Sequence, residues 1–450
     1  MCEAGFGVPR GKSGGAWAMR VCVVGAGYVG TVAAACLAEL GHEVVAIEVD
    51  SGKVRRLKRG EPCIHEPGLK DLMERGLKAG RLNFTSDYEE ASGRDIALIC
   101  VNTPPVEGGG YDLSPLLSAT RALCSLRRPP SCIAVKSTVP VGTISKLERV
   151  VREICGEEGP PLASNPEFLR EGRAVEDFLK PTRIVIGARD EKAARLLRSL
   201  YEGLNAPVIV TTPETAELIK LAANAFLSTR ISFVNEIARL CEKFGADIEV
   251  VAEAIGLDPR IGRHYLKAGI GFGGACLPKD LRFLISLGER AGEEVALLKG
   301  VERVNETQPL RALSMLEKAL GGLKGKVIAV LGLTFKPGTD DIRDSPALKV
   351  AKALVERGAK VRAHDPALLG RISKLLPEAV ECKTPEEASK GADAIAILTD
   401  WPEYKSLDLS ALTRSMRGKV LFDGRRLLKP EQAKAAGLIY VAIGWGGKEG

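Results

Sequence analysis

The fold of this chain is decided by residues 21–30, which read VCVVGAGYVG. The first four residues are apolar and predict a buried strand, and the three glycines that follow have the spacing of a turn between a strand and a helix. Such glycines let a diphosphate approach the amide groups at the start of the helix. A helical stretch, a stop at Gly41 and an apolar run that ends at Ile47 complete a strand–helix–strand unit.

An acidic residue, Glu48, stands at the end of the second predicted strand, eighteen residues after Gly30. A carboxylate at this place can accept hydrogen bonds from both ribose hydroxyls and repels a 2′-phosphate, so we expect NAD rather than NADP. The glycine turn alone would be a weak signal, but the strand before it and the acid after it make it specific. The alternative is an α/β domain whose glycines serve only the turn.

More apolar runs follow at 96–101, 132–135 and 183–187, and they predict a parallel, doubly wound sheet. A second strand–helix–strand pattern opens at Lys326. Its loop after the first strand offers Thr, Phe and Lys instead of glycine, so it should not hold a dinucleotide. Lys336 in this loop could neutralise a phosphate, although a solvated surface lysine is an equally good interpretation. The second pattern comprises strands at 327–331, 360–363, 394–398 and 420–422 and a helix at about 346–357.

One long helix is predicted between the two patterns. Thr212 is its expected N-cap, Pro213 its first residue and Gly245 its stop. At ~1.5 Å per residue the helix would span about 45 Å, enough to bridge two domains and to offer a dimer surface. The predicted fold class is therefore α/β, with two Rossmann-like doubly wound parallel sheets joined by a long central helix and a helical middle domain.

The composition excludes several classes of protein. The chain has 450 residues, 45% of them apolar and 27% charged, with a net charge of +7. No apolar run reaches the ~18 residues of a membrane span, and the basic residues are too scattered for a nucleic-acid site. We expect a cytoplasmic protein that attracts an anionic small molecule. Eleven cysteines without a CxxC pair and four histidines without metal-ligand spacing indicate neither a disulfide framework nor a metal site.

Residues 271–280 read GFGGACLPKD and carry the most reactive side chain. Cys276 lies just before a helix that Pro278 begins, where helix amides and Lys279 favour a thiolate, and the glycines leave room for a substrate. The alternative is a buried, inert cysteine.

Two pairs of polar residues have helical spacing. Lys220 and Asn224 lie one turn apart on the long helix, although an amphipathic surface helix explains them equally well. Glu167 and Glu171 have the same spacing on a short helix that we expect Asn165 to cap, where they either do acid–base work or only favour the helix dipole.

Together these residues resemble the UDP-glucose/GDP-mannose dehydrogenase family, from Met19 to about Leu427, and are most like its UDP-glucose 6-dehydrogenase branch. Two positions depart from the family pattern, because Glu48 stands where Asp is usual and Ala275 where Ser is common. The resemblance to the family rests on ordered blocks at 25–30, 102–104, 137–143, 165–172, 217–224, 271–280, 335–343 and 423–425. The resemblance to the branch rests on 258–262 with Tyr265 and Leu266.

The Gly-rich residues 1–18 are expected to be a disordered extension. The resemblance implies an NAD-binding domain (19–211), a central helical dimerisation domain (212–321) and a UDP-sugar-binding domain (322–450). The implied catalytic residues are Cys276, Lys220, Asn224, Asp280, Glu167, Glu171 and Thr138. The implied NAD-binding residues are Gly25, Gly27, Tyr28, Val29, Gly30, Glu48, Lys53, Thr103, Thr138, Glu171, Lys279 and Arg343. The implied substrate-binding residues are Glu167, Phe168, Leu169, Arg170, Lys220, Asn224, Arg260, Tyr265, Phe272, Gly273, Lys336 and Arg425.

The resemblance further implies that UDP-glucose is oxidised to UDP-glucuronate by two NAD, with Cys276 as the covalent nucleophile. It also implies a homodimer in which Arg260 acts across the interface. Three alternatives remain at this point: a dehydrogenase of UDP-N-acetylmannosamine or GDP-mannose, a two-electron β-hydroxyacid dehydrogenase, and a non-catalytic dinucleotide sensor. A β-hydroxyacid dehydrogenase has no use for Cys276, and a sensor has no use for the whole block at 271–280.

Overall fold

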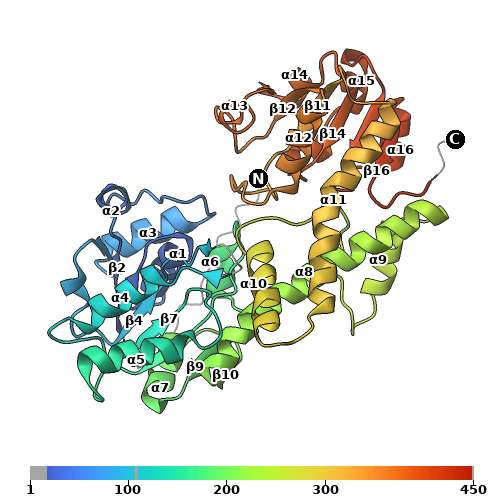
Figure 1. Ribbon diagram of the computed structural model, residues 1–450. Coiled ribbons are helices and arrows are strands. Elements are labelled where there is room, and N and C mark those ends of the chain that lie inside the picture. Colours follow the sequence, from blue (N-terminus) through green and yellow to red (C-terminus); the bar gives the residue numbers. More distant parts are fainter. Residues whose placement is uncertain (1–17, 107–109, 448–450) are drawn as a thin grey trace. The chain divides into compact units, whose positions relative to one another are not determined.

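The computed structural model describes residues 18–106 and 110–447. The chain divides into two compact units, Met1–Lys220 and Leu221–Gly450, and each is built on one large sheet (Figure 1). The expected extension at 1–18 lies outside the described residues apart from Ala18. The finer division at 211 and 321 stays a prediction.

Unit 1 is built on an eight-stranded sheet within the described residues, in the order β10-β9-β8-β7-β4-β1-β2-β3. All neighbouring strands are parallel except β8 and β9, so β9 and β10 run opposite to the other six. The strands are β1 (Arg20–Val24), β2 (Glu43–Ile47), β3 (Leu82–Thr85), β4 (Ile96–Ile99), β7 (Ile133–Val135), β8 (Leu162–Ser164), β9 (Ile184–Ala188) and β10 (Val208–Thr211), beside a small hairpin of β5 (Pro105–Val106) and β6 (Gly110–Tyr111).

Helices cover both faces of this sheet, which explains why its strands are apolar without alternation. Val21 and Val23 on β1 pack into one core with α1, α3, α6 and α7, while Cys22 and Val24 face a second core with α4 and α5. The helices are α1 (Tyr28–Glu39), α2 (Ser51–Lys58), α3 (Leu69–Lys78), α4 (Ser114–Cys124), α5 (Thr143–Cys155), α6 (Ala174–Leu179) and α7 (Glu191–Leu200), with a 3-10 turn η1 (Tyr88–Ala91).

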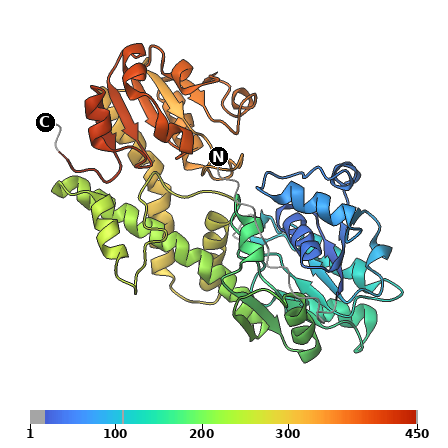
Figure 2. The same ribbon diagram turned by 180° about the vertical axis from the view of Figure 1, so that it is seen from behind.

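The predicted long helix is confirmed as α8 (Pro213–Phe244), 32 residues without a break (Figure 2). The Thr215 amide donates to Thr212 Oγ1 at 3.3 Å, which is the expected N-cap bond. Gly245 ends the helix in the left-handed region at φ 72°. The helix contributes its residues up to Lys220 to unit 1 and the rest to unit 2.

Unit 2 contains a sheet that is six-stranded within the described residues and parallel throughout, in the order β13-β12-β11-β14-β15-β16. The predicted strands are therefore confirmed, each to within one residue. The sequence patterns did not reveal the two edge strands. The strands are β11 (Val327–Leu331), β12 (Lys360–His364), β13 (Val380–Glu381), β14 (Ala394–Ile397), β15 (Val420–Asp423) and β16 (Ile439–Ala442).

This second sheet is also covered on both faces, as Figures 1 and 2 show in orange to red. Ile328 and Val330 pack with α8, α11 and α12, and Ala329 and Leu331 with α14, α15 and α16. Among the described residues no helix is both long and apolar enough to cross a membrane. The helices after α8 are α9 (Ile248–Gly256), α10 (Leu277–Arg290), α11 (Ala296–Leu320), α12 (Pro346–Glu356), α13 (Ile372–Leu375), α14 (Pro385–Ser389), α15 (Leu409–Ser415) and α16 (Pro430–Ala435), with a 3-10 turn η2 (Pro402–Ser406).

Candidate active site

The glycine turn after β1 has the geometry that a dinucleotide needs. Gly25 has φ +94°, and a Cβ on Gly30 would lie 1.8 Å from the Gly25 carbonyl oxygen, so both positions require glycine. A Cβ on Gly27 would meet only Asn102 Oδ1, at 3.9 Å. Gly27 is the N-cap of α1 and has no side-chain cap bond, so the amides of the first turn can receive a phosphate. Val29, in the same turn, packs against the core.

Glu48 follows β2 directly, as the sequence predicts, and its side chain is largely buried. Its Oε1 accepts a hydrogen bond from the Asp50 amide at 3.1 Å, and Lys53 Nζ lies 3.9 Å from Oε2. The carboxylate is thus held at the end of the strand next to one cation. This is the arrangement that ribose recognition requires.

Thr103 and Thr138 lie in the loops that follow β4 and β7. The Thr103 hydroxyl donates to the Thr138 carbonyl oxygen at 2.8 Å, and the Ser137 hydroxyl donates to the Val101 carbonyl oxygen at 2.6 Å. Two predicted NAD-binding residues from distant parts of the sequence are therefore tied together at one edge of the sheet.

Tyr28 connects the glycine turn to the loop that contains Glu171. Its hydroxyl donates to the Glu66 carboxylate, and the Gly172 amide donates to both side chains. Burial and the Glu66 hydrogen bond raise the pKa of Tyr28, so the hydroxyl keeps its proton. Glu66 also accepts from the Ala174 amide at 2.8 Å, which caps α6. The sequence patterns gave no signal for Glu66, because the two amides that it binds lie over one hundred residues away.

Lys220 and Glu167 form a buried ion pair at 3.0 Å, with side chains only 5% and 8% exposed. The ring of Phe168 lies 5.5 Å from Lys220 Nζ and 3.8 Å from the Arg183 guanidinium, so it makes cation–π contacts with both. The neighbouring Leu169 is partly buried against the core of unit 1. The structure therefore brings together Lys220 and Glu167, which the sequence placed in one catalytic group.

The short helix expected from Asn165 to Glu171 is wrong, because this segment is an irregular loop and α6 begins only at Ala174. Asn165 caps nothing: its amide donates to the Val185 carbonyl oxygen, and its oxygen accepts from Lys136 and Tyr201. The Glu167 carboxylate accepts from the Leu169 amide and folds the loop back on itself. These bonds compete with helix formation.

In unit 2 the candidate nucleophile stands at the start of α10. Cys276 is the N-cap of this helix and is exposed, whereas Asp280, one turn later, is buried. Asn224 Nδ2 donates to Asp280 Oδ2 at 2.6 Å, and Lys279 Nζ lies 3.4 Å from Asp280 Oδ1. Four predicted site residues thus gather around the first turn of one helix.

The glycines before Cys276 serve the packing of the protein itself. A Cβ on Gly273 would lie 2.4 Å from the Asp344 carbonyl oxygen, and one on Gly274 would lie 2.8 Å from the Phe335 ring. Phe272 forms two backbone hydrogen bonds with the Asn305 side chain. We expected these glycines to leave room for a substrate. At Gly273 and Gly274 the space that a Cβ would take is instead occupied by Asp344 and Phe335.

Arg425 holds three segments of unit 2 together. Its guanidinium donates to the carbonyl oxygens of Leu398, Gly271 and Phe335, at 2.8, 3.1 and 3.3 Å. Lys336, next to Phe335, lies with Nζ 5.4 Å from that ring. Arg425 therefore fixes the loop that carries Lys336 and the glycine-rich loop at the same time.

Asp365 occupies the turn that follows β11, so this turn of the second sheet is not available to a dinucleotide. It follows β12 as Glu48 follows β2, but it is fully buried. Its Oδ2 accepts from the amides of Leu333 and Thr334 at 2.7 and 3.0 Å. Those amides follow β11, at the place where the first sheet has its glycine turn. The sequence patterns missed Asp365, although it stands only two residues after the predicted strand at 360–363.

The remaining predicted arginines point to the surface. Arg170 pairs with Asp177, Arg260 with Asp258 and Arg343 with Asp341, each at 2.6 Å. The Arg343 carbonyl oxygen accepts from the Gly274 amide, so its backbone belongs to the Cys276 loop. Tyr265 has φ 61°, a rare conformation for a tyrosine. No group of three or more metal-ligating side chains occurs among the residues that the structure describes.

Comparisons with known proteins agree over most of the chain. Three models of the UDP-glucose/GDP-mannose dehydrogenase family match: the NAD binding domain at 19–205, the central domain at 214–307 and the UDP binding domain at 329–430. A UDP-glucose 6-dehydrogenase of Bacillus subtilis is 43% identical over 429 residues, which are 95% of this chain and 98% of the relative.

Solved structures give the same result. A UDP-glucose dehydrogenase from the hyperthermophilic archaeon Pyrobaculum islandicum is 44% identical, with a TM-score of 0.89, and the match covers 97% of this chain and 99% of the other. A UDP-D-ManNAc dehydrogenase from Pyrococcus horikoshii is 33% identical, with a TM-score of 0.85 and coverage of 95% and 100%. The chain therefore belongs to the UDP-glucose/GDP-mannose dehydrogenase family and is an NAD-dependent nucleotide-sugar oxidoreductase.

Proposed function

We propose that this protein is a UDP-glucose 6-dehydrogenase that oxidises the primary alcohol of UDP-glucose to the carboxylate of UDP-glucuronate. The observation that carries the proposal is the first turn of α10, where an exposed Cys276 precedes a buried Asp280 bonded to Asn224. An alcohol oxidised twice passes through a reactive aldehyde, and a cysteine thiolate can retain that aldehyde as a covalent adduct.

The residues of unit 1 fit NAD, which when bound would supply the hydride acceptor for each of the two oxidation steps. Gly25, Gly27 and Gly30 would receive the diphosphate at the start of α1, and Glu48 the ribose hydroxyls. Thr103 and Thr138 would line the far end of the cofactor site, where the Thr103 hydroxyl donates to the Thr138 carbonyl oxygen.

Cys276 carries the covalent steps. Its sulfur adds to the aldehyde carbon and the carbonyl oxygen takes up a proton, which gives a thiohemiacetal. Loss of the second hydride and of that proton leaves a thioester, and water then displaces the sulfur to give the acid and regenerate the thiolate. The amides at the start of α10 stabilise the thiolate in the free and released states.

Lys220 and Asn224 would act on the oxygen at the reacting carbon. Both carry hydrogen-bond donors, and donors aimed at a developing oxyanion contribute ~3 kcal/mol each in comparable sites. Glu167 holds Lys220 in place through their ion pair, and Asp280 holds the Asn224 amide. The side chains available as general base for the hydrolysis are Asp280, Glu171 and Lys220.

The nucleotide end of the substrate would be bound by the second sheet. Lys336 lies in the loop after β11, at the carboxyl end of the strands, where ligands of such sheets bind. Its ammonium group can neutralise a diphosphate as a point charge. Arg425 would act by fixing this loop, because its donors already bind carbonyl oxygens.

We further propose that the protein is a homodimer. Phe226, Phe233, Leu240 and Phe244 follow each other at intervals of seven, seven and four residues on α8, and each is at least half exposed. A row of large apolar side chains on one helix face favours a second copy of the same face, which is the isologous contact of a two-fold dimer. Arg260 pairs with its neighbour Asp258, and Arg230 fixes the same loop by donating to two of its carbonyl oxygens. In the dimer, Arg260 would then reach the substrate of the other subunit. The cytoplasmic location stays a prediction.

The covalent mechanism is tested with Cys276→Ser and Cys276→Ala. A serine hydroxyl is nearly isosteric but keeps its proton near neutral pH, so both variants should fold, bind NAD and fail to form UDP-glucuronate. The measurements are NADH formed per UDP-glucose, which should be two for the wild type, and the intact mass of each variant after turnover. Formation of UDP-glucuronate at the wild-type rate by either variant would refute the mechanism. The same assay with UDP-N-acetylmannosamine and GDP-mannose tests the sugar.

A further inference from the structure

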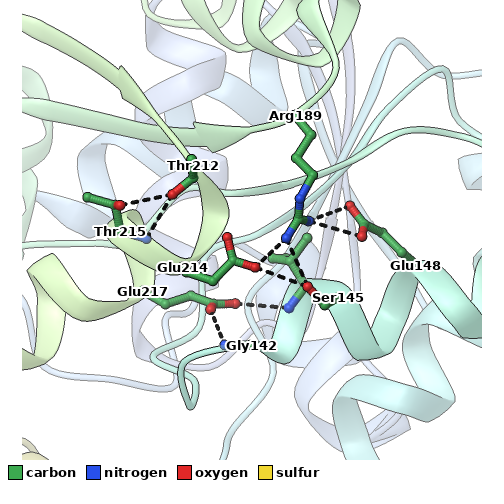
Figure 3. Close-up of polar contacts among 9 residues, drawn as sticks. Gly142, Ser145, Glu148, Arg189, Thr212, Glu214, Thr215 and Glu217 are labelled. Carbon is green, nitrogen blue, oxygen red and sulfur yellow. Dashed lines mark hydrogen bonds and ion pairs between the residues drawn. The ribbon is translucent and has the colours of Figure 1, made fainter.

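Glu217, on the part of α8 that belongs to unit 1, makes a contact that the reaction above does not use. Its Oε2 accepts from the Gly142 amide at 2.6 Å and its Oε1 from the Ile144 amide at 2.9 Å (Figure 3). Only 2% of the residue is exposed. Gly142 is the N-cap of α5 and has no side chain to cap the helix, so a carboxylate from α8 takes that role.

The contact links α8 to two segments of the proposed active site. Gly142 ends the loop that starts at Ser137 and contains Thr138. Lys220 follows Glu217 by three residues on the same helix and pairs with Glu167 from the loop after β8. Glu217 therefore sets the position of α8 against the loop after β7, one turn before the residue that acts on the substrate.

The charged groups around Glu217 do not neutralise it directly. On α8 itself, Glu214 accepts from the Ser145 hydroxyl at 3.0 Å and pairs with Arg189, which precedes α7. Arg189 also binds Glu148 on α5 at 2.9 Å, as Figure 3 shows. The guanidinium thus lies between two other carboxylates. Burial, opposed by the two amide bonds, raises the pKa of Glu217 to about 7.

We propose that Glu217 is a positioning residue, and that its ionised carboxylate holds Lys220 at the place where the reaction needs it. The inference rests on the proposed function. An ionised carboxylate offers both amides an acceptor, whereas a protonated carboxyl or a glutamine places a donor against one of them. Because its folded-state pKa lies near neutrality, the carboxylate should release one of the two amides as the pH falls through about 7.

The pH dependence that Glu217 gives to protein stability has the opposite sign to the pH dependence expected for activity. A carboxyl whose pKa rises on folding binds its proton more tightly in the folded protein, so its contribution to stability is lost as pH rises from about 4.5 to about 7. Glu217→Gln removes the buried charge and should therefore not lower the melting temperature at about pH 8. If Glu217 served only stability, Glu217→Gln would lower the melting temperature at this pH.

The test measures kcat, both KM values and the melting temperature from about pH 5.5 to about pH 9 for the wild type, Glu217→Gln and Glu214→Gln. Glu214, on the same helix but partly exposed, is the matched control. Wild-type kcat should fall on the acid side with a midpoint at about pH 7. Glu217→Gln should lower kcat about tenfold or more at pH 8 and change KM by less than about threefold. Its kcat should not show the fall on the acid side. Glu214→Gln should keep this fall and a kcat within about twofold of the wild type.

A Glu217→Gln variant with wild-type kcat and the same acid limb overturns the inference, and so does a loss of kcat that follows a lower melting temperature. Failure of the wild type to oxidise UDP-glucose is a failure of the proposed function instead. Amide hydrogen exchange then decides without turnover. Peptides spanning 142–147 and 213–220 should exchange faster in Glu217→Gln and at an unchanged rate in Glu214→Gln, and unchanged exchange in both variants overturns the inference.

Discussion

At the scale of single residues, two carboxylates decide what the two sheets can bind. Glu48 follows β2 and leaves the amides of the glycine turn available, whereas Asp365 follows β12 and occupies the equivalent amides itself. Both follow a strand and precede a turn, so the same acidic position serves a ligand in one sheet and the protein's own loop in the other. The second sheet must then bind phosphate through a side chain, and Lys336 is placed to do so.

The choice of cofactor should depend on the pair of Glu48 and Lys53. Glu48→Ala should raise the KM for NAD about tenfold, because hydrogen bonds to a charged acceptor are lost. The variant should also prefer NAD to NADP less strongly than the wild type does. Lys53, 3.9 Å from the carboxylate, would then face a 2′-phosphate. The double variant Glu48→Ala/Lys53→Ala should lose the gained NADP activity. Initial rates with both cofactors measure this, and equal use of NAD and NADP by the wild type would contradict the ribose assignment.

Single residues also show where sequence reasoning ends. The pairing of Lys220 with Glu167 was predictable as membership of one cluster, since both belong to segments that resemble the family. The loop around Asn165 was not, because the side chains that divert Asn165 from capping are Lys136 and Tyr201, which come from other elements. The roles of Glu66 and Asp365 were not predicted for the same reason, since both bind backbone amides that only the fold brings near.

At the scale of elements, the glycine turn gives a matched pair of substitutions. A Cβ on Gly30 would overlap the Gly25 carbonyl oxygen, which belongs to the backbone and cannot move aside. Gly30→Ala should therefore destabilise the protein by about 3 kcal/mol or more. Gly27→Ala meets nothing closer than 3.9 Å, so it should change stability by less than about 1 kcal/mol while weakening NAD binding. Thermal unfolding and NAD titration check both; equal stability of the two variants would contradict the geometry.

Elements differed in how far the sequence determined them. Helix α8 was predictable from end to end, because Thr212, Pro213 and Gly245 act through local backbone geometry. The direction of β9 was not, because an apolar run of five residues packs equally well parallel or antiparallel to β8. The edge strands β13 and β16 are short or partly exposed, and their apolar pattern is correspondingly weak.

At the scale of the whole molecule, the proposed dimer can be tested on the exposed row of α8. Phe233→Asp places a charge in the centre of the row and should reduce the mass in solution to that of one chain. Leu297→Asp, at an apolar position on α11 that is 69% exposed, is the control and should leave the mass unchanged. Light scattering of both variants gives the answer. Dissociation of neither or of both would contradict an interface at this face.

A dimer with shared sites makes a further prediction. If Arg260 serves the partner's substrate, then mixing inactive Arg260→Ala and Cys276→Ala subunits should restore activity in hybrid dimers, because one of the two sites then has both residues intact. Random mixing should restore about one quarter of the wild-type rate. Absence of recovery after confirmed subunit exchange would place Arg260 in its own subunit's site or outside the reaction.

The exposure of Cys276 has a practical consequence. The other cysteines of the described residues are buried or half-buried, so among these a thiol-directed reagent will meet Cys276 first. Alkylation measured on the peptide that contains Cys276 therefore counts the competent sites in a preparation, and an electrophile joined to a nucleoside diphosphate becomes a selective inactivator. The position of one sulfur thus makes the protein open to covalent labelling and to affinity-directed inhibitors.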